Sequence, residues 1–123
     1  MAYDPNNIFA KILRGEIPCD KIYEDEFALA FPDINPQAPV HALVIPKGDY
    51  VSMADFTADA PAELIAGFMR AVGKTAEKLD LVEPGYRTLA NAGGHAHQDV
   101  PHLHIHIFGG KPLGPMLDKG FSA

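Results

Sequence analysis

The histidine-rich segment 102–107 constrains the fold most, because polar and aliphatic side chains alternate there without a break as His-Leu-His-Ile-His-Ile. Successive side chains of a strand point to opposite faces of a sheet. The pattern therefore predicts a strand over 102–108, with three imidazoles on one face and three aliphatic side chains on the other. The aliphatic face can pack in a core, and the imidazole face then looks into a polar site, since burying unpaired histidines is costly.

A long amphipathic helix is predicted over about 60–79. Its apolar side chains recur at helical spacing and form one stripe, which comprises Leu64, Ile65, Phe68, Met69, Val72, Ala76 and Leu79. Pro61 suits the first turn of this helix. We expect its apolar stripe to cover the aliphatic face of the histidine strand. A shorter helix is predicted over 8–13, where Gly15 ends the run.

The remaining segments complete an α+β domain. Further strands are predicted over 22–24, 27–31, 41–45 and 86–91. The segment 50–57 is expected to be irregular or a short helical turn, and the segment 92–101 is expected to be a loop. We therefore predict an antiparallel five-stranded sheet with one long and one short helix. The 123 residues suit a single domain, 1–123, in which the Pro- and Gly-containing stretch of about 110–123 forms an extended tail.

The charge balance limits the partners. Ten Lys and Arg residues against sixteen Asp and Glu residues give a net charge of −6, which argues against a general nucleic-acid or anionic-membrane binder. A small phosphate-bearing ligand remains compatible, because the local field of a pocket can oppose the net charge. Neither a signal peptide nor an apolar stretch of roughly 20 residues is visible, so a cytoplasmic protein is expected. The single cysteine, Cys19, excludes an internal disulfide and a Cys-rich zinc module.

The histidine cluster has three interpretations. The imidazoles could simply cover the exposed face of an amphipathic strand. They could bind zinc, with His41, His95 or His97 as a further ligand and the Asp99 carboxylate behind the ligands. Alternatively, a neutral imidazole could attack phosphorus and later be released by water, while a neighbouring histidine handles a proton near neutral pH. The chain has no Walker motif, but the glycines of the Asn91-Ala92-Gly93-Gly94 loop could let backbone amides approach a phosphate.

The run 102–108 resembles the signature of the histidine triad family. Further segments resemble its Hint branch, the purine nucleoside phosphoramidases, and these are Ile8–Leu13, Glu16–Pro18, Ala30–Pro39 and His41–Pro46. The ending 109–117 looks like that of the bacterial members, so the resemblance covers nearly the whole chain.

The resemblance implies a hydrolase that cleaves the P–N bond of adenosine or guanosine 5′-phosphoramidates, aminoacyl-type adducts included, through a covalent nucleotidyl-histidine. It implies no cofactor, and a homodimer whose sheets join edge to edge. Two alternatives of the same family are a dinucleotide polyphosphate hydrolase and a nucleotidyl transferase. An alternative of another class is a zinc- or nucleotide-binding interaction module without turnover.

The same resemblance assigns roles to individual residues. His104 would be the nucleophile, His106 would contact the phosphate, and His102 would orient the nucleophile with His41 behind it. Asp33 would bind the ribose hydroxyls. The apolar wall around the base would comprise Phe9, Ile12, Ile17, Phe31, Ile34 and Leu43, and the surroundings of the phosphate and leaving group would comprise Asn91, His97, Gln98 and Asp99.

Three positions depart from the family pattern. His97 stands where glycine is usual, and Pro101 replaces the usual aromatic residue before the triad. Asp99 stands where eukaryotic members carry serine and bacterial members often carry an acid. These differences leave the reaction class intact and bear on the choice of leaving group.

Overall fold

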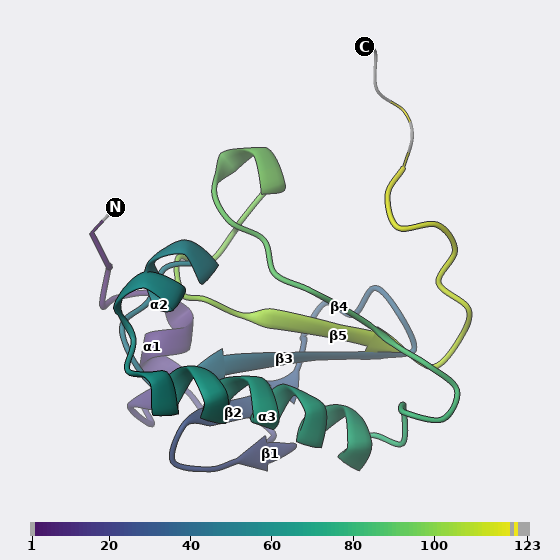
Figure 1. Ribbon diagram of the computed structural model, residues 1–123, viewed down its shortest axis with the longest axis horizontal. Coiled ribbons are helices and arrows are strands. Elements are labelled where there is room, and N and C mark those ends of the chain that lie inside the picture. Colours follow the sequence, from purple (N-terminus) through teal and green to yellow (C-terminus); the bar gives the residue numbers. More distant parts are fainter. Residues whose placement is uncertain (1, 119, 121–123) are drawn as a thin grey trace.

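The chain folds into an α+β domain with a five-stranded antiparallel sheet, as the sequence predicts (Figure 1). The computed structural model describes residues 2–118 and 120. In chain order the elements are α1 (Ile8–Leu13), β1 (Tyr23–Glu24), β2 (Ala28–Pro32), β3 (Val40–Pro46), α2 (Met53–Asp59), α3 (Ala62–Lys78), β4 (Arg87–Leu89), the 3₁₀ turn η1 (Gly94–Ala96) and β5 (Ile105–Gly109). The strand order is β1-β2-β3-β5-β4, so β5 lies between β3 and β4.

Each face of the sheet is covered by a different helix. Figure 1 shows α3 lying along the sheet, and its buried side chains pack on one face. On that face the sheet contributes small and aliphatic side chains, namely Ala28, Ala30, Ala42, Val44, Ile105 and Ile107. The other face packs against Phe9 of α1 through Leu29, Phe31, Leu43 and Ile45. The alternation along β2 and β3 thus divides the core into two clusters, and the face toward α1 carries the pocket described below.

Helix α3 has the predicted amphipathic character, with one correction. Phe68, Val72 and Ala76 are buried as expected, whereas Met69 is 47 % exposed. Met69 follows Phe68 by about 100° around the helix axis, which places it at the margin of the stripe. The buried Thr75 is compatible with the core because its hydroxyl donates to the carbonyl oxygen of Ala71 at 2.7 Å.

The segment 50–57, expected to be irregular or a short helical turn, contains most of the seven-residue helix α2. A capping box starts this helix. The Ser52 hydroxyl accepts from the Ala54 N–H at 3.3 Å, and the Asp55 carboxylate accepts from the Ser52 N–H at 2.7 Å. Phe56 anchors the helix because its fully buried ring packs edge-on against Tyr50 and Phe68.

Strand β5 is shorter than the alternation suggests, since it begins at Ile105 rather than at residue 102. The residues before it are fixed by other bonds, among them the Leu103 N–H to the carbonyl oxygen of Tyr50 at 2.8 Å. The aliphatic half of the pattern is nevertheless confirmed. Leu103, Ile105 and Ile107 all lie in the cluster beneath α3.

The segment after β5 runs away from the sheet without helix or strand over residues 110–118 (Figure 1). The Arg87 guanidinium holds it by donating to the carbonyl oxygens of Gly114 at 2.8 Å and Pro115 at 3.4 Å. The end of the predicted tail, at 119 and 121–123, lies outside the described residues. Within residues 2–118 and 120, no helix has the length and apolar character needed to cross a membrane.

Candidate active site

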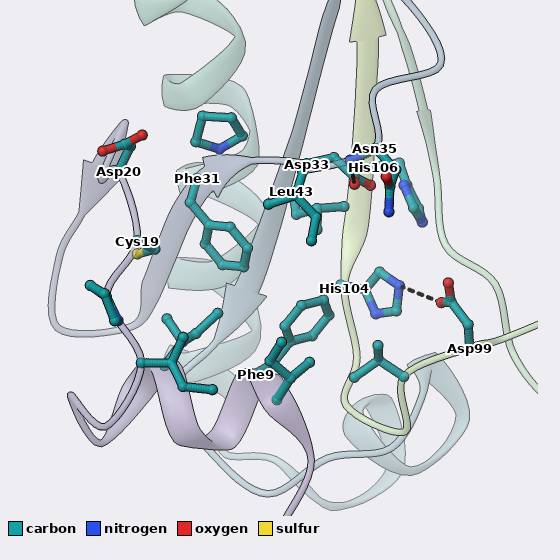
Figure 2. A pocket seen from close by; sticks show the side chains of 17 residues that line it. Phe9, Cys19, Asp20, Phe31, Asp33, Asn35, Leu43, Asp99, His104 and His106 are labelled. Carbon is teal, nitrogen blue, oxygen red and sulfur yellow. Dashed lines mark hydrogen bonds and ion pairs between the residues drawn. The ribbon is translucent and has the colours of Figure 1, made fainter.

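A pocket of about 730 Å³ opens on the face of the sheet that α1 covers. Ten residues singled out from the sequence line it, namely Phe9, Ile12, Ile17, Phe31, Asp33, Ile34, Leu43, Asp99, His104 and His106. In Figure 2 the two histidines and Asp99 lie at one end, and Cys19 and Asp20 lie at the other. The rings of Phe9 and Phe31 stand between these ends. The pocket thus combines a polar end with an apolar body, and its lining contains no lysine or arginine among the described residues.

His104 presents an unprotonated nitrogen at the polar end. Its Nδ1 lies 2.7 Å from the carbonyl oxygen of His102. Because a carbonyl only accepts, Nδ1 carries the proton and Nε2 keeps a lone pair. Nε2 faces the pocket, 4.0 Å from Oδ1 of Asp99 (Figure 2). The ring of Phe9 packs edge-on against the imidazole, with ring centroids 5.0 Å apart, and holds it in place.

The proton of His106 is fixed by a chain of three groups. The Gln37 N–H donates to Nδ1 of His41 at 3.1 Å, so the proton of the neutral His41 lies on Nε2. That Nε2–H donates to Nδ1 of His106 at 2.9 Å, which leaves the His106 proton on Nε2. Nε2 of His106 is buried and has no hydrogen-bond partner among the described residues. A buried donor without a partner is a site for an acceptor such as a phosphate oxygen.

The expectation that His41 lies behind His102 is wrong. In the antiparallel register of β3 and β5, His41 is opposite Phe108 and Leu43 is opposite His106, so His41 lies beside His106. His102 is fully buried and does not line the pocket. Its Nε2–H donates to the carbonyl oxygen of Pro46 at 3.1 Å, and its Nδ1 accepts from the Tyr3 hydroxyl at 2.6 Å. His102 remains on the side of Phe9, with ring centroids 6.3 Å apart, but it is buried, and only His104 and His106 of the three reach the pocket.

Burial keeps the supporting histidines neutral. It lowers the pKa of His102 and of His41, with the Asp33 carboxylate opposing the shift at His41. At His106 burial acts together with the neighbouring His104 and His41 and lowers the pKa to about 4. A neutral state at pH 7 agrees with the single proton that the hydrogen bonds assign to each ring.

The donor atoms of Asp33, His41 and His106 all lie within 4.8 Å of one another, a spacing that a metal ion could use. Their hydrogen bonds argue for a different arrangement. A metal at Nε2 of His41 would displace the proton that this nitrogen carries while Nδ1 accepts from Gln37. His95 and His97, the other ligands considered, are exposed on the loop 92–101. The donor set therefore fits a hydrogen-bonded chain better than a metal centre.

The loop before the triad is held by Gln98. Its amide donates to the carbonyl oxygens of Val51 at 2.6 Å and Val100 at 3.1 Å, and its carbonyl accepts from the Gly93 N–H at 3.0 Å. His97 adopts a left-handed conformation with φ of 55° and is exposed, which explains why glycine suits this position. Asn91, His97 and Gln98 do not line the pocket, contrary to expectation. Gln98 instead braces the loop that carries Asp99.

Several lining residues were missed by sequence reasoning. They are Ile8, Pro18, Cys19, Asp20, Pro32, Asn35 and Val100. Most adjoin a predicted residue, and Asn35 is recognisable because its N–H bonds the carboxylate of Asp33 at 2.8 Å in a local turn. No sequence signal connects Tyr3 with His102, which is 99 positions away.

Comparison with known proteins gives a consistent result. The chain matches the HIT domain over residues 14–113. It is 64 % identical over 118 residues to a 13.2 kDa HIT-like protein of Azospirillum brasilense, covering 96 % of this chain and 97 % of the relative. It is 43 % identical over 110 residues to the purine nucleoside phosphoramidase of Escherichia coli K12, covering 89 % and 92 %.

Solved structures agree with these sequence relationships. A histidine triad protein from Clostridium difficile superimposes with a TM-score of 0.83 at 39 % identity, covering 93 % of this chain and 98 % of the other. A HIT family hydrolase from Clostridium thermocellum superimposes with a TM-score of 0.82 at 42 % identity, covering 89 % and 95 %.

Proposed function

Because the chain belongs to the HIT domain family, we propose that it is a hydrolase that cleaves the P–N bond of purine nucleoside 5′-phosphoramidates. One observation carries the proposal most strongly. The Nδ1–H of His104 is bonded to the carbonyl oxygen of His102, so the Nε2 lone pair is free at the polar end of the pocket. The name of the Escherichia coli relative supports the choice of substrate.

The reaction proceeds in two displacements at phosphorus. Nε2 of His104 attacks the α-phosphorus, a P–Nε2 bond forms, and the bond to the amine breaks as the amine takes up a proton. The nucleotidyl imidazole retains its Nδ1–H, and the His102 carbonyl stabilises the positive charge that develops on the ring. Water then attacks the same phosphorus and loses a proton, and the electron pair of the P–Nε2 bond returns to His104. The products are the nucleoside monophosphate and the free amine.

The neighbouring groups have complementary tasks. The unpartnered Nε2–H of His106 donates to a non-bridging phosphate oxygen as charge grows in the transition state. Asp99 lies on the leaving-group side, where its carboxylate attracts a cationic amine or, when protonated, its carboxyl group passes a proton to the departing nitrogen. Asp33 accepts from the ribose hydroxyls, and Phe9, Phe31 and the surrounding aliphatic side chains contact the purine.

The charge of the lining favours this reaction over cleavage of dinucleotide polyphosphates. A polyphosphate chain is usually held by lysine, arginine or a metal ion, and the pocket lining contains neither cationic residue among the described residues. Neutral donors are adequate for a phosphoramidate, whose single phosphate carries one negative charge.

Release of AMP or GMP from adenosine and guanosine 5′-phosphoramidate tests the function directly. We expect turnover by the wild-type protein, equal rates with and without a chelator, and none by His104→Ala. If the wild-type protein leaves both phosphoramidates intact, the proposal is wrong. Turnover that disappears with the chelator would instead support the zinc alternative.

We also propose a homodimer. Among residues 2–118 and 120, the edge strand β4 pairs only with β5, so its other edge is free to pair with a second copy. Apolar side chains that precede β4 in the chain are exposed, namely Val82 at 59 % and Tyr86 at 41 %. Sedimentation at micromolar concentration should give the mass of two chains, and a monomeric mass would contradict the proposal.

A further inference from the structure

The first two histidines of the triad, His102 and His104, lie before the paired part of the sheet. β5 begins at Ile105, so the backbone of His102, Leu103 and His104 is not fixed by strand pairing. Yet the His102 carbonyl oxygen determines which nitrogen of His104 carries the proton. Two backbone bonds hold this stretch, from the Leu103 N–H to the carbonyl oxygen of Tyr50 at 2.8 Å and from the His102 N–H to that of Val100 at 2.9 Å. The His102 side chain adds two further bonds.

Two groups hold the His102 ring from opposite ends. The carbonyl oxygen of Pro46, at the end of β3, accepts from Nε2–H at 3.1 Å. The Tyr3 hydroxyl lies 2.6 Å from Nδ1, and because Nδ1 is then unprotonated, the hydroxyl is the donor. The Tyr3 ring also packs edge-on against the imidazole, with ring centroids 5.6 Å apart. Since His102 is fully buried, no solvent molecule substitutes readily for either partner.

We propose that Tyr3 is a positioning residue for the reaction: its hydroxyl fixes the His102 ring, and the His102 carbonyl oxygen in turn fixes the proton and orientation of His104. The kinetic part of this inference rests on the proposed function.

The N-terminal segment is built to hold Tyr3 in place. The buried Asn7 caps α1 by accepting from the Ala10 N–H at 2.9 Å, and its amide donates to the carbonyl oxygen of Asp4 at 2.7 Å. Arg14, after the helix, donates to the carbonyl oxygen of Pro5 at 2.8 Å. These bonds tie residues 4–7 to α1, the helix whose Phe9 contacts His104. Tyr3 is thus anchored to the same helix that lines the pocket.

The variant Tyr3→Phe isolates the hydroxyl, because it keeps the ring and its edge-on contact. It leaves Nδ1 of His102 buried without a donor, which favours a shift or rotation of that imidazole. We expect kcat on an adenosine phosphoramidate to fall about tenfold, with KM within about twofold of wild type, because Tyr3 does not line the pocket.

The hydrogen bond can be followed directly by ¹⁵N NMR of histidine-labelled protein. In the wild-type protein, Nδ1 of His102 should show the signal of an unprotonated, hydrogen-bonded nitrogen, and Nδ1 of His104 that of a protonated one. Tyr3→Phe should move both signals and leave those of His95 unchanged. Tyr23→Phe is a matched control, since it removes another tyrosine hydroxyl bond, 2.8 Å long, to Asp25 beside β1. It should leave kcat and both signals as in wild type.

Two results would overturn the inference. One is a Tyr3→Phe protein with wild-type kcat, and the other is a reduced kcat with unmoved signals of His102 and His104, since the loss would then arise elsewhere. A wild-type protein without phosphoramidase activity refutes the proposed function instead. The spectra still decide in that case whether the Tyr3 hydroxyl controls the two rings.

Discussion

Oδ1 of Asp99 lies 4.0 Å from Nε2 of His104, and the two side chains differ greatly in exposure, 74 % for Asp99 and 3 % for His104. The carboxylate therefore stands at the solvent side of the attacking nitrogen. In the proposed reaction we assign the departing amine to this solvent side, near the Asp99 carboxylate.

Asp99→Ser should change the ranking of substrates by their leaving amine. A phosphoramidate with a second positive charge on the amine should lose about two- to fivefold in kcat/KM relative to a neutral one, because the pair is largely exposed. The measurement is kcat/KM for one cationic and one neutral substrate in both proteins. Asp59→Ser, which removes the same charge from the end of α2, serves as the control. Equal losses of kcat/KM for the two substrates, or no loss, would show that Asp99 does not discriminate between leaving amines.

His104→Ala should abolish turnover while nucleoside monophosphate binding stays close to wild type. Without Nε2 no covalent route exists, whereas the walls around the base and ribose are unchanged. Rapid quenching of the wild-type reaction with labelled substrate, followed by peptide mapping, should place the nucleotidyl group on His104. An adduct on His102 or His106 would contradict the assignment.

His106→Ala should reduce kcat by about 10²–10³-fold, because it removes a donor aimed at charge that grows in the transition state. KM should change less than kcat. Replacement of the exposed His95 by Ala is the matched control and should leave both constants unaltered. An unchanged kcat in His106→Ala would mean that its Nε2–H does not contact the phosphate.

The free energy of unfolding should fall as the pH is lowered from about 6.5 to 4. The unfolded chain takes up protons on histidine near pH 6.5, whereas the folded protein holds the pKa of His106 at about 4 and lowers those of His41 and His102. For His106 alone the loss is about 3 kcal/mol. Glu24, whose pKa is about 2 in the folded protein, adds to the loss only at the lower end of this window and below it, where the carboxylate of the unfolded chain is protonated.

Urea unfolding at several pH values measures this slope. His106→Gln should flatten it, and a variant of the exposed His95 should keep it. A wild-type stability that is constant between pH 6.5 and 4 would show that these histidines titrate normally in the folded protein.

The sequence was sufficient for the sheet faces and for most of the pocket. Alternation at 102–107 correctly placed Leu103, Ile105 and Ile107 beneath the long helix, because period two is a property of extended backbone wherever it occurs. The same pattern does not reveal where interstrand pairing begins. The alternation therefore suggested that all three imidazoles look into the polar site, whereas His102 is buried and does not line the pocket. The resemblance had given His102 only an orienting role.

Contacts between distant segments were beyond the sequence. Whether His41 lies beside His106 or His102 depends on the register of β3 against β5. The pattern of residues within each strand does not by itself fix how the two strands align. The segment of α2 was predicted only as irregular chain or a short helical turn, for a local reason: its capping box, Ser52 with Asp55, stands before a run too short to show helical periodicity.

Among the described residues the pocket lining contains no lysine or arginine, and this bears on how the nucleotide of the proposed reaction would arrive there. The chain carries a net charge of −6, and Asp20, Asp33 and Asp99 add negative charge around the pocket itself. An approaching anion is repelled over a distance of about 30 Å in 10 mM salt, but only about 8 Å at physiological ionic strength. Encounter is therefore slowest in dilute buffer and quickens as salt is added, the reverse of a site that attracts phosphate with cationic side chains. On the proposed function, the nucleotide would be recognised by contact alone, after diffusion has brought it to the pocket.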